Sequence, residues 1–141
     1  MKDEMFFDTN ILFYAYDLNE PVKRNSCLSL VEDAFKGRIN AVISNQILVE
    51  LYNAFTRKLG VAPATASIIV RSLIVSNNWK KLNYDDETVN RALRGCDVYG
   101  VQFPDSLIAE TMRENSVSEI ITEDIRHFSR FDGIVVRYPF K

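Results

Sequence analysis

The sequence predicts an α/β protein whose central sheet is mostly parallel and carries helices on both faces. Short apolar runs of strand length alternate along the chain with longer segments whose apolar residues recur at helical spacing. The chain has 141 residues, of which 47% are hydrophobic, and this is enough to bury one sizeable core. We therefore expect residues 1–141 to form a single domain.

The elements follow one another in a regular order. The apolar runs predict strands at residues 5–7, 41–43, 119–122 and 133–136, and an extended segment at 79–82. Helical spacing predicts helices at residues 22–35, 45–59, 64–75 and 85–94. Gly37 and Gly60 are suited to end the first two of these helices. Pro104 and Asp105 are suited to the first turn of one more helix.

Charge and cysteine content exclude several classes of protein. The chain carries 17 basic and 19 acidic residues, a net charge of -2, which excludes a polybasic nucleic-acid binder. Nucleic acid stays open as a ligand, because a metal ion can stand between protein and phosphate. Two isolated cysteines and one histidine make a Cys/His zinc site improbable and favour a reducing cytosol. The acidic opening residues and the lack of a long apolar run predict a cytoplasmic protein without a membrane partner.

Two aspartates lie where parallel strands end. Asp8 directly follows the first predicted strand, and Asp124 comes two positions after Thr122 at the end of another. Ligands of open α/β sheets bind beyond the carboxyl ends of the strands, so both carboxylates are expected at the same edge. Either one alone is explained equally well as a turn or helix cap.

Two further acids extend this pattern. Glu50 lies on the flank of an apolar helix stripe, and Asp105 lies in the first turn of a predicted helix. The simpler interpretation of Glu50 is an acid in a surface ion pair. The simpler interpretation of Asp105 is an acid that stabilises the start of a helix. If all four carboxylates meet, their repulsion requires a hard divalent cation such as Mg²⁺ or Mn²⁺. The chemistry that this arrangement suggests is metal-assisted phosphodiester hydrolysis.

Four segments, in order, resemble the acidic motifs of PIN-domain nucleases. They are residues 7–12 (FDTNIL), 43–52 (ISNQILVELY), 103–109 (FPDSLIA) and 121–124 (ITED). Arg57 and Lys58, together with residues 138–140 (YPF), also resemble the branch of VapC-type toxins. Any one motif is weak, whereas four acids in the expected order and elements are a strong match. The resemblance covers essentially the whole chain.

The resemblance implies a three-layer α/β/α sandwich and divalent-metal-dependent cleavage of RNA. Asp8, Glu50 and Asp105 would hold the main ion of one or two Mg²⁺ or Mn²⁺ ions, directly or through water, and Asp124 would lie farther out, among the outer partners of that ion. The side chains expected to orient carboxylates and water are Thr9, Asn10 and Thr122. The side chains expected to contact RNA phosphates are Arg57, Lys58, Arg126, His127 and Arg130. Glu123 is as easily a solvated loop residue, and we do not expect it in the site.

The resemblance also implies partners. VapC-like proteins are typically homodimers that a small cognate antitoxin inhibits, so this chain is expected to be the toxin of a VapBC-type pair. The apolar segment 68–75 is the candidate contact, although a buried core helix explains it equally well. The alternatives are a stand-alone PIN ribonuclease of RNA processing or quality control, and a non-catalytic α/β RNA-binding or regulatory module. A receiver domain is disfavoured, because no aspartate ends the extended segment 79–82.

Overall fold

The computed structural model describes residues 3–140, so Met1, Lys2 and Lys141 of the predicted domain lie outside the described residues. The described chain contains one sheet of five strands. They are β1 (Glu4–Phe7), β2 (Asn40–Ser44), β3 (Trp79–Leu82), β4 (Glu119–Ile121) and β5 (Val135–Arg137). The strand order is β3-β2-β1-β4-β5, and every neighbouring pair is parallel. The predicted α/β class with a parallel sheet is confirmed.

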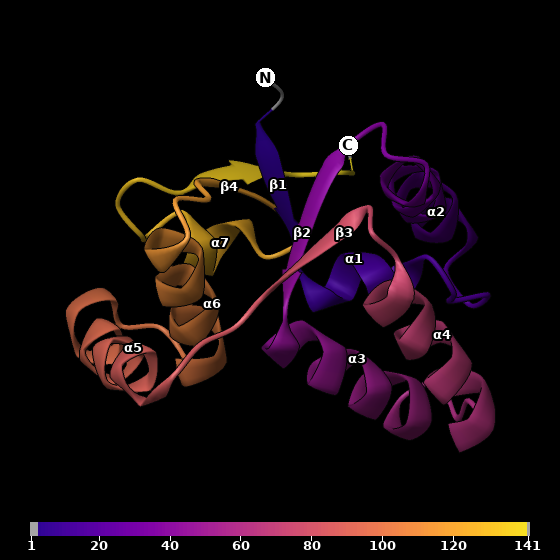
Figure 1. The fold of residues 1–141 in the computed structure, drawn as a ribbon, viewed down its shortest axis with the longest axis horizontal. Coiled ribbons are helices and arrows are strands. Elements are labelled where there is room, and N and C mark those ends of the chain that lie inside the picture. The colour runs from indigo at the N-terminus through magenta and orange to yellow at the C-terminus, as the bar shows by residue number, and fades with distance from the viewer. Residues whose placement is uncertain (1–2, 141) are drawn as a thin grey trace.

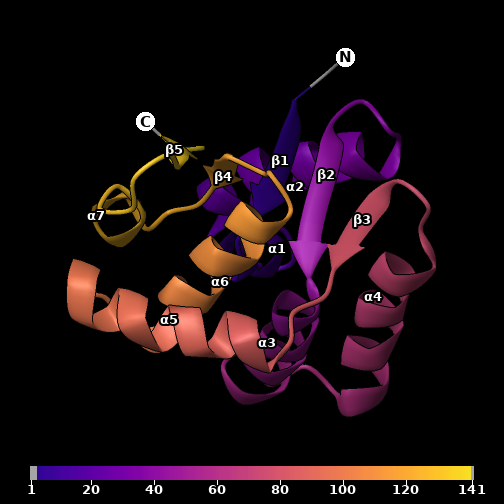
Figure 2. The same cartoon turned by 60° about the vertical axis from the view of Figure 1, so that its left-hand side comes forward.

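Helices cover both faces of this sheet (Figures 1 and 2). They are α1 (Thr9–Tyr14), α2 (Pro21–Phe35), α3 (Asn45–Arg57), α4 (Pro63–Val75), α5 (Asp86–Tyr99), α6 (Phe103–Glu114) and α7 (Ile125–Phe128). On one face α1 packs against α2 and α3, and α3 packs against α4, whereas α5 and α6 pack together on the other face. The expected three-layer arrangement is therefore present.

The order of the strands follows from the direction of the crossovers. The chain moves outward from β1 to β2 and β3, and then returns across the sheet to add β4 on the other side of β1. Because βαβ crossovers are right-handed, the two directions place their helices on opposite faces. The strand order therefore reverses between β1 and β4, and this is the point of an open parallel sheet where ligands bind.

The core is built on the central strands, whose apolar side chains face helices on both sides. Phe6 and Phe7 are fully buried, and the Phe7 ring meets the edge of Trp79 at 4.9 Å between ring centroids. On the other face, α6 is buried from Ser106 to Met112, because α5 covers it. This packing fixes the first turn of α6 relative to the ends of the strands.

Two short helices are absent from the predicted elements, and several boundaries differ from the predicted ones; for example, α3 ends at Arg57 and not at residue 59. The helices α1 and α7 span six and four residues, too few to show an apolar period in the sequence. Helix α5 continues past the predicted end at residue 94 to Tyr99, where Gly100 caps it in the left-handed conformation. The last strand begins at Val135 and not at Gly133, which has a φ of +78° in the preceding turn. No helix among the described residues is long and apolar enough to cross a membrane.

Candidate active site at the carboxyl edge of the sheet

A pocket of about 570 Å³ opens beyond the carboxyl ends of β1 and β4. The four predicted acids line it, each from a different element. Asp8 follows β1, Glu50 lies on α3, Asp105 lies in the first turn of α6, and Asp124 precedes α7. The fold thus brings together four carboxylates that are spread over most of the sequence.

Asp8 is held in place by neutral donors. Its side chain is 7% exposed and caps α1, where Oδ1 accepts a hydrogen bond of 2.7 Å from the Thr9 amide. Its Oδ2 accepts 2.7 Å from the Thr122 hydroxyl and 3.4 Å from Nδ2 of Asn10. The three residues expected to orient carboxylates therefore all contact Asp8.

Thr122 links the ends of the two central strands. Its buried hydroxyl donates to Asp8 and accepts a hydrogen bond of 2.9 Å from the Asp124 amide. The backbone amide of Asp8 in turn donates to the carbonyl of Ile121 at 3.1 Å. The positions of Asp8 and Asp124 are consequently coupled through one hydroxyl group.

Glu50 is fixed by two side chains. The Thr9 hydroxyl donates to its Oε1 at 2.6 Å, and Nε2 of Gln46 donates to its Oε2 at 2.9 Å. The same Gln46 nitrogen also donates to the carbonyl of Pro104 at 2.9 Å, which ties α3 to the start of α6. The sequence interpretation missed Gln46, although its spacing of four residues from Glu50 on one helix was a usable signal.

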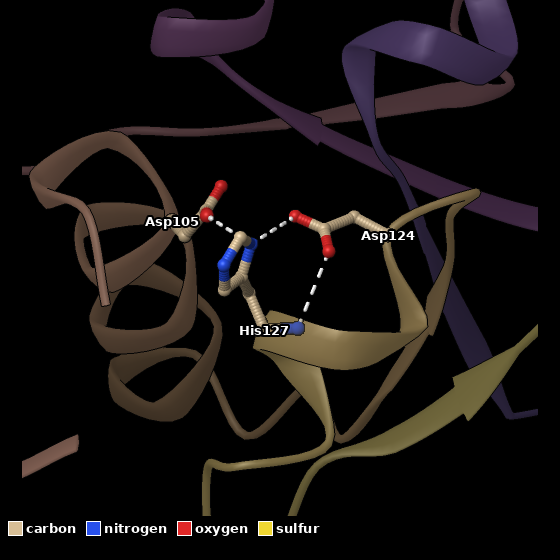
Figure 3. A group of neighbouring side chains, drawn as sticks. All are labelled: Asp105, Asp124 and His127. Atoms are coloured by element: carbon tan, nitrogen blue, oxygen red, sulfur yellow. Dashed lines mark hydrogen bonds and ion pairs between the residues drawn. The ribbon is translucent and has the colours of Figure 1, made fainter. Parts of the chain in front are cut away.

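Asp105, Asp124 and His127 form a compact cluster at one side of the pocket (Figure 3). Oδ1 of Asp124 accepts from the His127 amide at 3.2 Å, so Asp124 caps α7. Nδ1 of His127 lies 2.9 Å from Oδ2 of Asp124 and 3.6 Å from Oδ2 of Asp105. The imidazole thus faces two carboxylates that come from different helices.

Burial dominates the electrostatics of Asp8. It raises the pKa of Asp8 from 3.8 to about 7, against the lowering effect of the bonds from Thr122 and Thr9. The charges of Asp105 and Glu50 add smaller increases. A carboxylate in this position is costly to ionise unless a cation compensates its charge.

Asp105 shows the same effect to a smaller extent. Burial, followed by the charge of Asp124, raises the pKa of Asp105 from 3.8 to about 6. Glu50 adds to the increase, and His127 opposes it. Asp105 therefore interacts electrostatically with acids on both sides of the pocket.

The five basic side chains predicted to contact RNA separate into three groups. Arg57 and Lys58 are exposed at the end of α3 and line the pocket. Arg126 is exposed on α7, and Arg130 donates to the carbonyl of Gly100 at 2.9 Å, away from the acids. His127 is half-buried, and its ring faces the carboxylates of Asp105 and Asp124. Of these five described side chains, those of Arg57 and Lys58 are the ones that line the pocket.

Glu123 lines the pocket but has its own partners. Its Oε1 accepts from Lys23 at 2.5 Å, and its Oε2 accepts from the Tyr14 hydroxyl at 2.8 Å. The Glu123 carboxylate holds the pKa of Lys23 above its ordinary value. The charge of Glu123 is thus compensated within the protein, unlike that of Asp8.

The donor set fits a hard divalent cation. Carboxylate oxygens are the ligands that Mg²⁺ and Mn²⁺ prefer, and four of them line one pocket. The hydrogen bonds to Asp8 and Glu50 fix their orientation, as outer partners of metal ligands do. Burial and neighbouring acids raise the pKa values of Asp8 and Asp105, and a bound cation would favour the ionised form of both carboxylates.

Fold and site together define an open α/β protein with an acidic pocket at the switch point of its parallel sheet. The family model of the PIN domain matches residues 5–134, and the chain therefore belongs to the PIN domain family. The resemblance of the sequence to PIN-domain proteins is confirmed by this match. A search of the curated proteins finds no match to the chain.

Solved structures with the same fold include components of toxin–antitoxin systems. A chain of VapBC2 from Rickettsia felis, solved bound to a promoter DNA fragment, has 16% identity and a TM-score of 0.68, covering 96% of this chain and 98% of that one. A chain of DNA-bound VapBC from Salmonella typhimurium has 20% identity and a TM-score of 0.65, covering 99% and 100%. VapC20 from Mycobacterium tuberculosis, described as a sarcin–ricin-loop-cleaving toxin, has 15% identity and a TM-score of 0.61, covering 82% and 86%. At these identities the likeness establishes the fold.

Proposed function

We propose that the protein is a divalent-metal-dependent endoribonuclease that hydrolyses phosphodiester bonds of RNA. The observation that carries this proposal is the convergence of Asp8, Glu50, Asp105 and Asp124 on one pocket. Membership of the PIN domain family supports it. The VapC20 neighbour is described as a toxin that cleaves the sarcin–ricin loop, which favours RNA as the substrate class.

The residues of the chain have separate roles in this proposal. Asp8, Glu50 and Asp105 hold one Mg²⁺ or Mn²⁺ ion through their oxygens, and Asp124 contributes to a second ion. When bound, a divalent cation supplies positive charge that stabilises the attacked phosphate and the leaving oxygen. Thr9 keeps the two neighbouring acids in place, because its amide binds Asp8 and its hydroxyl binds Glu50.

Substrate contacts are assigned to the basic wall of the pocket. Arg57 and Lys58 extend from the end of α3 and are exposed, so they can reach phosphates that flank the cleaved bond. The overall charge of -2 does not favour RNA at long range. Binding is therefore expected to depend on these two side chains and on the metal.

The likeness to VapBC components suggests the biological setting. We assign this chain the role of the toxin of a VapBC-type pair in the cytoplasm, with a cognate antitoxin as its inhibitor. A second copy of the chain is expected to pack on α4, whose outer face exposes Ile68 and Val75. If expression does not arrest growth, and no neighbouring gene product suppresses the ribonuclease, the chain is a stand-alone PIN ribonuclease.

The decisive experiment is RNA cleavage by purified protein with Mg²⁺ or Mn²⁺, compared with EDTA and with Asp8→Asn. Structured RNAs, including ribosomal and transfer RNA, serve as substrates. The matched control is Asp132→Asn, because Asp132 is exposed and does not line the pocket. We expect cleavage that EDTA and Asp8→Asn abolish and that Asp132→Asn retains.

Other outcomes contradict the proposal in different ways. Cleavage that survives both EDTA and Asp8→Asn would show that these carboxylates do not carry the activity. A wild-type protein that binds RNA but cleaves none of the substrates with either metal would be a non-catalytic RNA-binding module.

A further inference from the structure

His127 is the only histidine of the sequence, and its ring lies beside Asp105 and Asp124, two acids of the carboxylate pocket. One ligand atom each from Asp105, Asp124 and His127 lies within 4.8 Å of the other two. The His127 side chain is 34% exposed and that of Asp105 is 20% exposed, so a cation from solvent can reach the cluster. The cluster thus combines two carboxylates with a nitrogen donor.

The distances suit a single coordination sphere. Ligand atoms about 2.1 Å from a cation are about 3.0 Å apart in adjacent octahedral positions and about 4.2 Å apart in opposite ones. Nδ1 of His127 lies 2.9 Å from the Asp124 oxygen and 3.6 Å from the Asp105 oxygen. Both distances from Nδ1 fall within or near this range, and the two carboxylate oxygens lie within 4.8 Å of each other.

The fold holds this arrangement. Asp124 uses one oxygen to cap α7 at the His127 amide, so its other oxygen and the imidazole are on the same turn. The next residue, Phe128, is fully buried and anchors α7 against the core. Helix α7 packs against α6, which carries Asp105 in its first turn. Backbone positions therefore set the convergence of the three side chains.

We propose that His127, with Asp105 and Asp124, ligates a second cation and makes that position selective for transition metals such as Mn²⁺ over Mg²⁺. The ligand atom is Nδ1, with the ring proton on Nε2. Imidazole nitrogen binds first-row transition metals, whereas Mg²⁺ keeps to oxygen ligands and water. The inference rests on the proposed function, since Asp105 is shared with the ion assigned to Asp8 and Glu50.

Cobalt provides a direct test of ligation, because a single histidine gives a single set of imidazole signals. Metal-stripped full-length protein is titrated with Co²⁺ and followed by proton NMR. Coordination through Nδ1 places the exchangeable Nε2 proton far outside the diamagnetic range. A ring that only donates a hydrogen bond to Asp124 gives no such resonance, and its absence at saturating Co²⁺ would overturn the proposal.

Selectivity is measured by calorimetry with Mn²⁺ alone and Mg²⁺ alone. Titrations in an Asp8→Asn background isolate the second position, which does not use Asp8. Adding His127→Gln, a neutral side chain with an amide oxygen, is expected to weaken Mn²⁺ binding about tenfold or more. Mg²⁺ binding is expected to change little. Equal losses for the two cations would contradict the selectivity.

Controls separate this inference from the function on which it rests. Ser129→Ala changes an exposed residue at the end of α7 and is expected to bind Mn²⁺ as the parent does. Circular dichroism melts check that each variant is folded. Mg²⁺-dependent RNA cleavage without the shifted imidazole resonance would refute only the ligation by His127 and would leave the ribonuclease proposal standing. The shifted resonance without cleavage by any cation would refute the ribonuclease and leave the metal site standing.

Discussion

Asp8 shows how one residue joins fold and site. Its carboxylate caps α1, contacts Thr122 across the sheet and lies almost fully buried beside other acids. These neutral hydrogen bonds orient the carboxylate, but they do not remove the cost of its burial. The metal-free protein is therefore destabilised at this residue at neutral pH.

The first prediction concerns pH and stability without metal. Between pH 3.8 and about 7, folded Asp8 keeps a proton that the unfolded chain has lost, so its contribution to stability falls as pH rises. Asp8→Asn removes this penalty, which is at most roughly 4 kcal/mol above pH 7. Urea unfolding in EDTA is expected to show a larger gain for the variant at pH 8 than at pH 5. A gain independent of pH would contradict the raised pKa.

The second prediction concerns Thr9, whose hydroxyl binds Glu50 while its amide binds Asp8. Thr9→Val keeps the shape and the amide but leaves Glu50 without this donor. RNA cleavage is expected to fall by about 10- to 100-fold, with little change in the melting temperature. Thr9→Ser retains the hydroxyl and serves as the control. Equal activity of the two variants would show that the hydroxyl does not position Glu50.

At the scale of elements, the contact between α5 and α6 places Asp105. The Ser106 hydroxyl donates to the carbonyl of Ala92 at 2.7 Å, and Gly95 lets the two helices approach closely. A Cβ at Gly95 would stand 2.4 Å from the Ser106 oxygen. The small residue in α5 thus sets the position of the helix turn that carries an acid of the pocket.

The third prediction tests this contact. Gly95→Ala is expected to destabilise the protein by about 1–3 kcal/mol, because the helices must separate or a side chain must move. The double variant with Ser106→Ala removes the oxygen in the way, and the next nearest atom lies at 3.7 Å. Chemical unfolding measures both. The double variant should be less destabilised than the sum of the two single changes, and simple additivity would contradict the steric cause.

At the scale of the whole molecule, α4 divides its apolar residues between two faces. Ala66, Val70 and Leu73 are buried in the core, whereas Ile68 is 70% and Val75 76% exposed. The two interpretations of this segment, core helix and contact surface, therefore each describe one face. The exposed face is where a second copy of the chain is proposed to pack.

The fourth prediction addresses that surface. Ile68→Lys places a charge on the exposed face of α4 and is expected to convert a dimer into a monomer, as measured by light scattering during gel filtration. Leu93→Lys is the matched control, because Leu93 is exposed to 54% on α5. A wild-type monomer at micromolar concentration, or a dimer unaffected by Ile68→Lys, would exclude this face.

The sequence by itself determined the fold class, the strands and the longer helices. Buried parallel strands must be continuous apolar runs, and a helix with one buried face must repeat its apolar residues, so both patterns are local. It also indicated which acids to expect, because Asp8 and Asp124 follow strands and Asp105 begins a helix, whereas Glu50 lies beside the apolar stripe of a helix. The short helices α1 and α7 escaped prediction, since helices of this length are stable only through their caps and tertiary contacts.

Only the tertiary structure decided how these parts meet. The strand order places β1 beside β4, so Thr122 binds Asp8 across 114 positions of sequence. Packing of α3, α6 and α7 decides that Gln46 reaches Pro104 and that His127 faces Asp105. Such distances depend on the packing of elements that are remote in the chain, and no local pattern of residues encodes them.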